Sequence, residues 1–212
     1  MRFRDRADAG RALARLVGYL EGEQPVVLGL PRGGVAVAAE VAASLHAPLD
    51  VLVVRKLGHP QQPELGVGAI AEGDVTLVNS DLVAQTGVTS AELRRIEQRE
   101  ATELTRRVAA YRGARPRTPV SGRTVLVVDD GVATGFTARA AVEALRRQGA
   151  ARIVVAVPVA SVEAVEHLRR LADEVVCVDT PAAFVSTGQA YDDFSQVSDA
   201  EVTRALALRP EL

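Results

Sequence analysis

Two adjacent acids, Asp129 and Asp130, follow an apolar stretch and precede a glycine-containing turn in the segment TVLVVDDGVATGFT (124–137). Glycines at 131 and 135 free the backbone of this turn, so its successive N–H groups can surround a phosphate. The two acids would repel a bare phosphate, but carboxylates accept strong hydrogen bonds from neighbouring sugar hydroxyls. We therefore interpret the segment as a sugar-phosphate site, and a pair of acids that only caps the next helix is the structural alternative. The candidate residues are Asp129, Asp130, Gly131, Val132, Ala133, Thr134, Gly135 and Thr137.

The elements that must position this turn are a strand before it and a helix after it. Along the chain, apolar strands alternate with amphipathic helices, which is the pattern of a parallel sheet covered on both faces. We expect strands at 25–30, 49–55, 67–72, 75–79, 124–130, 152–159 and 174–180. We expect helices at 6–21, 35–45, 90–112, 137–148, 161–171 and 199–208. The strand at 75–79 follows its predecessor so closely that the two should be antiparallel, because a parallel crossover needs a dozen or more residues.

The composition limits the class of protein. The 212 residues suit one domain, 1–212, and they are 48% hydrophobic and 25% charged with a net charge of −2. No general attraction to nucleic acid is indicated, and a single cysteine, Cys177, excludes an intramolecular disulfide. The start of the sequence lacks the apolar core of a signal peptide, and no apolar run approaches the ~18 residues of a spanning helix. We expect a soluble cytoplasmic protein without a membrane or nucleic-acid partner.

Two further segments carry cations where a predicted strand ends. The first, GLPRGG (29–34), combines an arginine side chain with two glycine amides, which together would bind a second anion. An ordinary glycine-rich helix start is the structural alternative. The second segment holds Lys56, the single lysine among 25 basic residues, and a compact ammonium suits a phosphate or diphosphate.

The segment VLVVDDGVATGFT resembles the signature of the type I phosphoribosyltransferases, which use phosphoribosyl diphosphate (PRPP) as donor. The resemblance covers about residues 25–194 and implies an α/β, Rossmann-like fold with a mostly parallel central sheet flanked by helices and a small hood. It implies that the two acids hold the ribose hydroxyls, and that the following loop wraps the 5-phosphate. The acids would also bind Mg²⁺, directly or through water. A chain similar to this family would transfer the phosphoribosyl group to a nitrogenous acceptor, such as a nucleobase, and release diphosphate.

The same resemblance assigns roles elsewhere in the chain. The diphosphate would be bound by Arg32, Gly33, Gly34, Arg55 and Lys56, with a non-proline cis peptide at Pro31–Arg32. The stretch 57–66 matches a mobile loop that closes over the reacting centre, and its ionisable candidates for catalysis beside Lys56 are His59 and Glu64. A solvated loop histidine is the alternative for His59. The final loop, about 180–199, resembles an acceptor-binding loop with Phe184, Val185 and Tyr191 as its contacts, and packing of these aromatics onto the core is the alternative.

Departures from the family pattern reduce the range of acceptors that the resemblance allows. Ala133 stands where the hypoxanthine and guanine enzymes have a third acid, and VAVPVASVE (155–163) lacks the lysine that reads a 6-oxopurine. The charged helical excursion at about 80–115 is unmatched, and it would form either a hood over the acceptor or an oligomer surface such as that of a homodimer. Two alternatives to a transferase stay open: a non-catalytic PRPP-sensing regulator and, with less support, a relative that makes PRPP.

Overall fold

The central element is a five-stranded parallel sheet. The computed structural model describes residues 1–207, so Leu208, the predicted last residue of the final helix, lies outside the described residues. The strands are β1 (Val26–Gly29), β2 (Leu49–Val51), β6 (Thr124–Val128), β7 (Arg152–Val159) and β8 (Glu174–Asp179). Their order in the sheet is β2-β1-β6-β7-β8, and every neighbouring pair is parallel. The mostly parallel central sheet predicted from the alternation of strands and helices is therefore confirmed.

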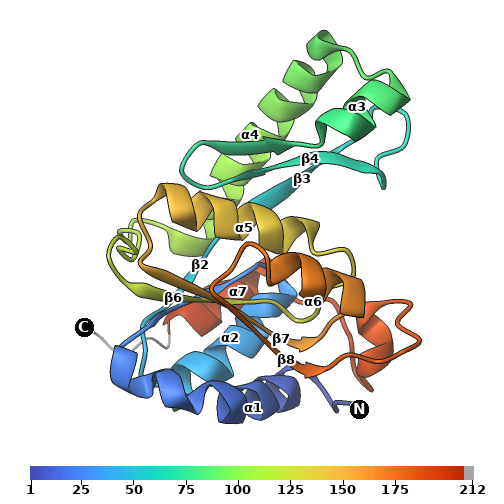
Figure 1. Ribbon diagram of the computed structural model, residues 1–212. Helices are drawn as coiled ribbons and strands as arrows, with labels where there is room; N and C mark the ends of the chain where they lie inside the picture. The colour runs from blue at the N-terminus through green and yellow to red at the C-terminus, as the bar shows by residue number, and fades with distance from the viewer. Residues whose placement is uncertain (208–212) are drawn as a thin grey trace.

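Helices cover both faces of this sheet (Figure 1). One face packs against α1 (Arg6–Val17), α2 (Gly33–Ser44) and α7 (Asp199–Ala207), and the other face against α5 (Phe136–Arg147) and α6 (Val162–Leu168). Alternate strand residues supply the two cores: Leu126 and Val128 point to the first group of helices, and Val125 and Val127 to the second. The two short 3₁₀ segments are η1 (Gly18–Glu23) and η2 (Thr187–Ala190), and η1 takes over where the predicted first helix was expected to continue.

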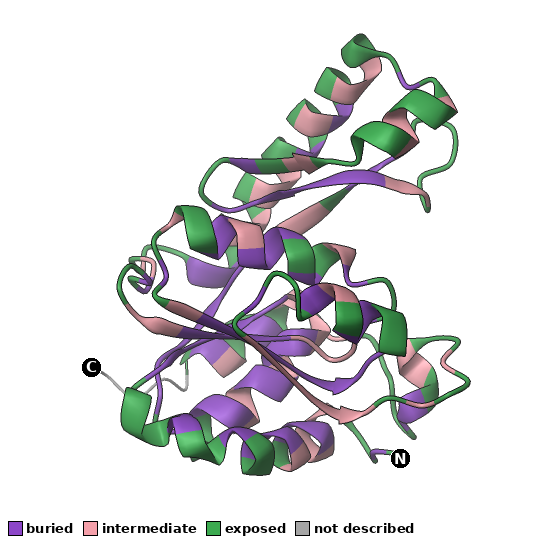
Figure 2. Cartoon of the chain, in the orientation of Figure 1, coloured by how far each residue is buried: buried purple, intermediate pink, exposed green. Residues whose placement is uncertain are grey.

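A second, antiparallel sheet projects from the first and forms what we call the cap, residues 54–112 (Figures 1 and 2). It contains β3 (Val54–Gly58), β4 (Gly66–Ala71), β5 (Val75–Val78), α3 (Ser80–Thr86) and α4 (Ser90–Arg112). The predicted antiparallel arrangement of β4 and β5 is confirmed. The helix at 90–112 has the predicted bounds, because a capping box between Thr89 and Glu92 starts it and Gly113 follows its last residue.

The structure corrects the prediction of one strand at 49–55. The chain forms β2 in the parallel sheet, passes through Leu52 and Val53, and then forms β3 in the cap. Both linking residues are buried, so the apolar run continues through the break and gives no sign of it. The cap therefore begins with strands at Val54, ahead of the helical excursion expected at about 80–115, and its first helix, α3, was not predicted as a separate element.

A buried charge network ties the cap to the central sheet. Arg112, at the end of α4, donates to Glu72 Oε2 at 3.0 Å, to Asp50 Oδ1 at 3.2 Å and to the Val51 carbonyl at 3.0 Å. These charged side chains are buried, and buried charges are tolerated when they are paired and hydrogen-bonded. The network therefore joins the end of α4 to β2 and to the β4–β5 turn. Among residues 1–207, no helix has the length and apolarity needed to cross a bilayer.

Candidate functional site

The predicted phosphate turn, residues 129–135, which we also call the aspartate turn, lies at the carboxyl edge of the parallel sheet, between β6 and α5. Gly135 occupies the N-cap position of α5 with φ of 74°, a left-handed conformation that favours glycine. The turn is fastened to the next strand, because Val132 N donates to the Val159 carbonyl at 2.9 Å and Ser161 Oγ donates to the Ala133 carbonyl at 2.7 Å. A cavity of about 170 Å³ opens at the turn, and it is lined by Asp129, Gly131, Val132, Ala133, Thr134, Gly135, Phe136, Thr137, Ala138 and Thr187.

The two aspartates of the turn have different surroundings. Asp130 Oδ2 receives a hydrogen bond from Arg6 Nε at 2.8 Å, and both side chains of this ion pair are less than a fifth exposed. Asp129 has no basic partner within ion-pair distance in the described residues, and its Oδ1 accepts only the amide N–H of Asp130 at 2.9 Å. Burial raises the pKa of Asp129 well above the ordinary aspartate value, and the neighbouring Asp130 carboxylate raises it further. The paired acid and the unpaired acid lie side by side at the mouth of the turn.

Arg6 is a site residue that sequence reasoning missed. Besides its bond to Asp130, it donates from Nη1 to the Ser195 carbonyl at 2.8 Å, and its guanidinium lies 4.1 Å from the centroid of the Phe194 ring. It therefore connects α1, the aspartate turn and the segment after β8. No local signal marks it, because it is one of several arginines near the start of the sequence and its partners lie 124 and 189 residues away.

The glycine loop after β1 packs directly against the aspartates. A Cβ on Gly33 would lie 1.9 Å from Asp130 Oδ2, and a Cβ on Gly34 would lie 2.7 Å from the Val128 carbonyl oxygen. The structure thus brings together the two glycine-containing segments that the sequence singled out. The Pro31–Arg32 peptide bond is cis, as the resemblance implied. The Arg32 Nη1 atom lies 3.9 Å from Asp199 Oδ1, and among the described residues Arg32 forms no ion pair with Asp129 or Asp130.

The segment after β8 contributes a third wall to the site. A Cβ on Gly131 would lie 2.3 Å from Thr187 Cγ2, so this threonine packs against the aspartate turn. Val185 is 83% exposed, whereas Phe184 is half-buried against the cluster around Phe3.

Tyr191 was predicted to contact the acceptor, and the structure corrects this prediction. Its side chain is only 3% exposed and its ring lies between those of Phe3 and Phe194, so it offers no free face to a ligand. Its hydroxyl donates to the Asp130 carbonyl at 2.5 Å, and burial raises the pKa of that hydroxyl. Tyr191 is therefore a support of the aspartate turn.

The cationic candidates of the cap keep their contacts within the cap. Arg55 donates to Glu100 on α4 at 2.6 Å, and Lys56 Nζ donates to the carbonyl and a carboxylate oxygen of Glu64 at 3.1 and 3.3 Å. The premise that Lys56 follows a strand of the parallel sheet is wrong, because it lies inside β3. It does lie on the same face of β3 as Val54, which packs toward Ala144 of α5, whereas Arg55 lies on the opposite face.

The predicted loop at 57–66 is shorter than expected, because Leu57 and Gly58 belong to β3 and Gly66 begins β4. His59 is 8% exposed, so it is not the solvated histidine that its sequence context suggests, and its Nδ1 accepts a hydrogen bond from Gln61 N at 3.2 Å. Glu64 is fully exposed. Neither side chain forms a hydrogen bond or an ion pair with the aspartate turn within the described residues.

A metal ion could be held here only with the help of a ligand. Among residues 1–207, no group of three or more His, Cys, Asp or Glu side chains is placed to bind a metal. Asp129 and Asp130 offer two adjacent carboxylates, and Mg²⁺ is commonly held by one or two carboxylates, waters and the phosphates of a substrate. The donor set therefore fits Mg²⁺ and does not form an all-protein cage.

Comparisons with known proteins find relatives over most of the chain. The family described as "Phosphoribosyl transferase domain" matches residues 5–193. Two proteins of Mycobacterium tuberculosis, strains CDC 1551 / Oshkosh and ATCC 25618 / H37Rv, are 52% identical to this chain over 204 residues, and each is named "Putative phosphoribosyl transferase". The match covers 96% of this chain and 46% of each relative, so the chain spans about half the length of these curated relatives. The crystal structure of TT1426 from Thermus thermophilus is 45% identical, with a TM-score of 0.85 and 100% of both chains covered.

Proposed function

The chain belongs to the phosphoribosyl transferase domain family, and on this premise we propose that it transfers the 5-phosphoribosyl group of PRPP to a nitrogenous acceptor and releases diphosphate. The observation that carries the proposal is the meeting of three segments at one sheet edge. The glycine loop at 31–34 and Thr187 each pack against the aspartate turn so closely that no Cβ fits on Gly33 or Gly131. Open α/β sheets bind ligands at this edge, outside the carboxyl ends of the strands.

Each part of the site has a role in the proposed reaction. The 5-phosphate binds in the 170 Å³ cavity, where the first amides of α5 and the hydroxyls of Thr134 and Thr137 donate to its oxygens. Asp129 and Asp130 accept hydrogen bonds from the two ribose hydroxyls. The amides of Gly33 and Gly34 bind the diphosphate, and these donors stabilise the charge that develops as diphosphate leaves.

Mg²⁺ would be held by the aspartates together with the donor, and it would neutralise the leaving diphosphate. The protein itself contributes the orientation of the donor. Because Arg6 neutralises Asp130, that carboxylate stays hydrogen-bonded and fixed. Asp129 has no basic partner among the described residues, so its second carboxylate oxygen can accept the ribose hydroxyl. We include Lys56 as a diphosphate ligand because its face of β3 is directed toward α5, and we leave out Arg55 because Glu100 binds it.

The acceptor is proposed only as a class, a nucleobase or a similar heterocycle. Phe184 and Val185 stay candidates for acceptor contact, since they follow β8 at the same edge and Val185 is largely exposed. The absence of a lysine in 155–163 argues against a 6-oxopurine.

Calorimetry with PRPP and Mg²⁺ tests the donor site. Asp130→Asn should bind PRPP about 10- to 150-fold more weakly than the parent chain, since a hydrogen bond to a charged group contributes ~1.5–3 kcal/mol.

Lys56→Ala should weaken PRPP binding by an amount that shrinks with added salt, because part of the lost attraction is screened. Asp74→Asn is the matched control, because Asp74 is exposed in the β4–β5 turn and asparagine tolerates its positive φ of 57°.

A mass-spectrometric screen of a metabolite extract tests the transfer. In the presence of PRPP, the parent chain should convert one heterocycle into its phosphoribosyl derivative, and Asp130→Asn should form that product more slowly at limiting PRPP. PRPP binding without any turnover would favour the PRPP-sensing regulator instead. No binding of PRPP by a folded parent chain would refute both functions.

A further inference from the structure

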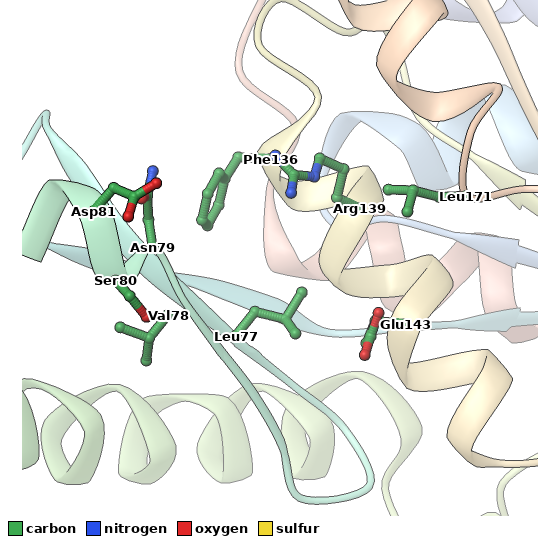
Figure 3. A pocket seen from close by; sticks show the side chains of 9 residues that line it. All are labelled: Leu77, Val78, Asn79, Ser80, Asp81, Phe136, Arg139, Glu143 and Leu171. Carbon is green, nitrogen blue, oxygen red and sulfur yellow. The ribbon is translucent and has the colours of Figure 1, made fainter.

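A second and larger cavity lies between the cap and α5 (Figure 3). Its volume is about 410 Å³, within the ~300–1,000 Å³ typical of small-molecule sites. Figure 3 shows the end of β5 with the start of α3 on one side and one face of α5 on the other, and Leu171, from the segment after α6, also borders the cavity. It is lined by Leu77, Val78, Asn79, Ser80, Asp81, Phe136, Arg139, Glu143 and Leu171.

Arg139 is the cation among the residues that line this cavity, and it pairs with no carboxylate within residues 1–207. Glu143 lies one turn further along α5, at a spacing that allows an ion pair, but its carboxylate is 3.4 Å from Arg147 instead. Within the described residues, Arg139 forms neither a hydrogen bond nor an ion pair. Its guanidinium carbon lies 5.8 Å from the centroid of the Phe136 ring. An exposed guanidinium that no described protein group binds, beside an aromatic ring, is suited to bind an anionic group.

The other residues that line the cavity suit a flat apolar group of a ligand. Leu77, Val78 and Leu171 bring aliphatic side chains to the cavity, and Phe136 adds an aromatic face. Val78 is 38% exposed and Leu171 37% exposed, so part of this apolar surface is open to solvent and would be covered by a ligand. Two carboxylates, Asp81 and Glu143, also line the cavity and disfavour a ligand with several negative charges.

We propose that this cavity is a binding site for a small aromatic molecule that carries a single anionic group, such as a carboxylate. The ring packs against Phe136 and the aliphatic wall, and the anion binds the Arg139 guanidinium. The site is separate from the phosphate turn, although Phe136 lines both cavities. Binding here does not depend on the proposed transferase activity.

The test uses naphthalene-2-sulfonate as an aromatic anion and naphthalene-2-methanol as its neutral counterpart, each titrated into ¹⁵N-labelled protein and followed by NMR. The sulfonate should shift the amide signals of residues that line the cavity. Arg139→Gln should weaken its binding at least about tenfold, because a charged hydrogen bond is lost. Leu171→Glu should weaken it to a similar extent, because it places a third carboxylate in the cavity. Arg94→Gln is the matched control and should bind like the parent, since Arg94 is an exposed arginine on α4 away from the cavity.

Three results would each overturn the proposal. Unchanged binding by a folded Arg139→Gln variant would show that the guanidinium is not the anion ligand. Equal affinity for the neutral alcohol would show that the charge is not recognised. Displacement of the sulfonate by ribose 5-phosphate would place it in the phosphate turn. Thermal unfolding of each variant, compared with the parent, confirms that loss of binding is not loss of the fold.

Discussion

Replacing Arg6 by glutamine should destabilise the protein and weaken PRPP binding together. The side chain of Arg6 is 11% exposed and that of Asp130 16%, so their ion pair is only weakly screened by solvent. The substitution removes a charged hydrogen bond worth ~1.5–3 kcal/mol, and it leaves the Asp130 carboxylate without its cation. The contact with Phe194 adds ~0.5–2 kcal/mol. Because these contributions share one side chain and are not additive, we expect a loss of about 2–4 kcal/mol in the free energy of unfolding.

Urea unfolding followed by circular dichroism measures this loss. Arg11→Gln is the control on the same helix, because Arg11 is 45% exposed and its carboxylate contacts are 3.5 and 3.6 Å long. Such surface pairs contribute ~0–1 kcal/mol, so the control should unfold near the parent midpoint. Arg6→Lys should lie between the two, since it keeps the charge but loses the planar group that also reaches the Ser195 carbonyl.

The reasoning would be refuted if Arg6→Gln unfolded at the same urea concentration as Arg11→Gln. Loss of stability with unchanged PRPP affinity would separate the two effects, and it would show that Arg6 supports the fold without orienting Asp130 for the ribose.

Two further predictions concern the same edge of the sheet. Gly33→Ala should destabilise the protein by ~1–3 kcal/mol and weaken PRPP binding, because the new Cβ would lie 1.9 Å from Asp130 Oδ2. Gly22→Ala is the control, because a Cβ on Gly22 has no neighbour within 4 Å. Urea unfolding and calorimetric titration of both variants should show a loss of stability and of PRPP affinity only for Gly33→Ala. The Asp129→Asn variant should be more stable than the parent at neutral pH. Burial raises the pKa of Asp129 in the folded parent above its ordinary value of 3.8. The folded parent therefore loses stability as the pH rises from 3.8 through the raised pKa, and the variant does not. That advantage should vanish near pH 4, and a pH-independent difference in urea midpoint would contradict the assigned cause.

The parts of the site that could be predicted from the sequence are those set by local chemistry. The aspartate turn was located because an apolar strand, two glycines and an amphipathic helix follow one another within 27 residues, 124–150. The glycine loop at 31–34 was located in the same way, and the structure places it against that turn. The expected helix at 90–112 matches α4, whose first turn is fixed locally by the capping box between Thr89 and Glu92.

The parts that could not be predicted depend on contacts between distant segments. Arg6 reaches the site because α1 packs on the sheet against β7 and β8, and its distance of 124 residues from Asp130 leaves no periodic signal in the sequence. The break between β2 and β3 lies at Leu52 and Val53. Both residues are apolar and buried, as is Val51 before them, so the hydrophobic pattern of the sequence does not change at the break. Tyr191 was predicted to contact the acceptor because an aromatic residue in a polar loop has the same sequence context whether its side chain faces a ligand or the core.

The joining of residues 3–6 to residues 190–195 has a consequence for the order of folding. Phe3 N donates to the Ala190 carbonyl at 2.8 Å, and Arg6 binds the Ser195 carbonyl across 189 positions. A nascent chain that has emerged through β8 holds every strand of the parallel sheet, yet it still lacks Thr187, Phe194 and Ser195. Loops this long close late, because contacts far apart in sequence form only after the intervening chain is ordered. During synthesis, the sheet can therefore assemble well before the aspartate turn acquires the surroundings that would let it hold a ligand.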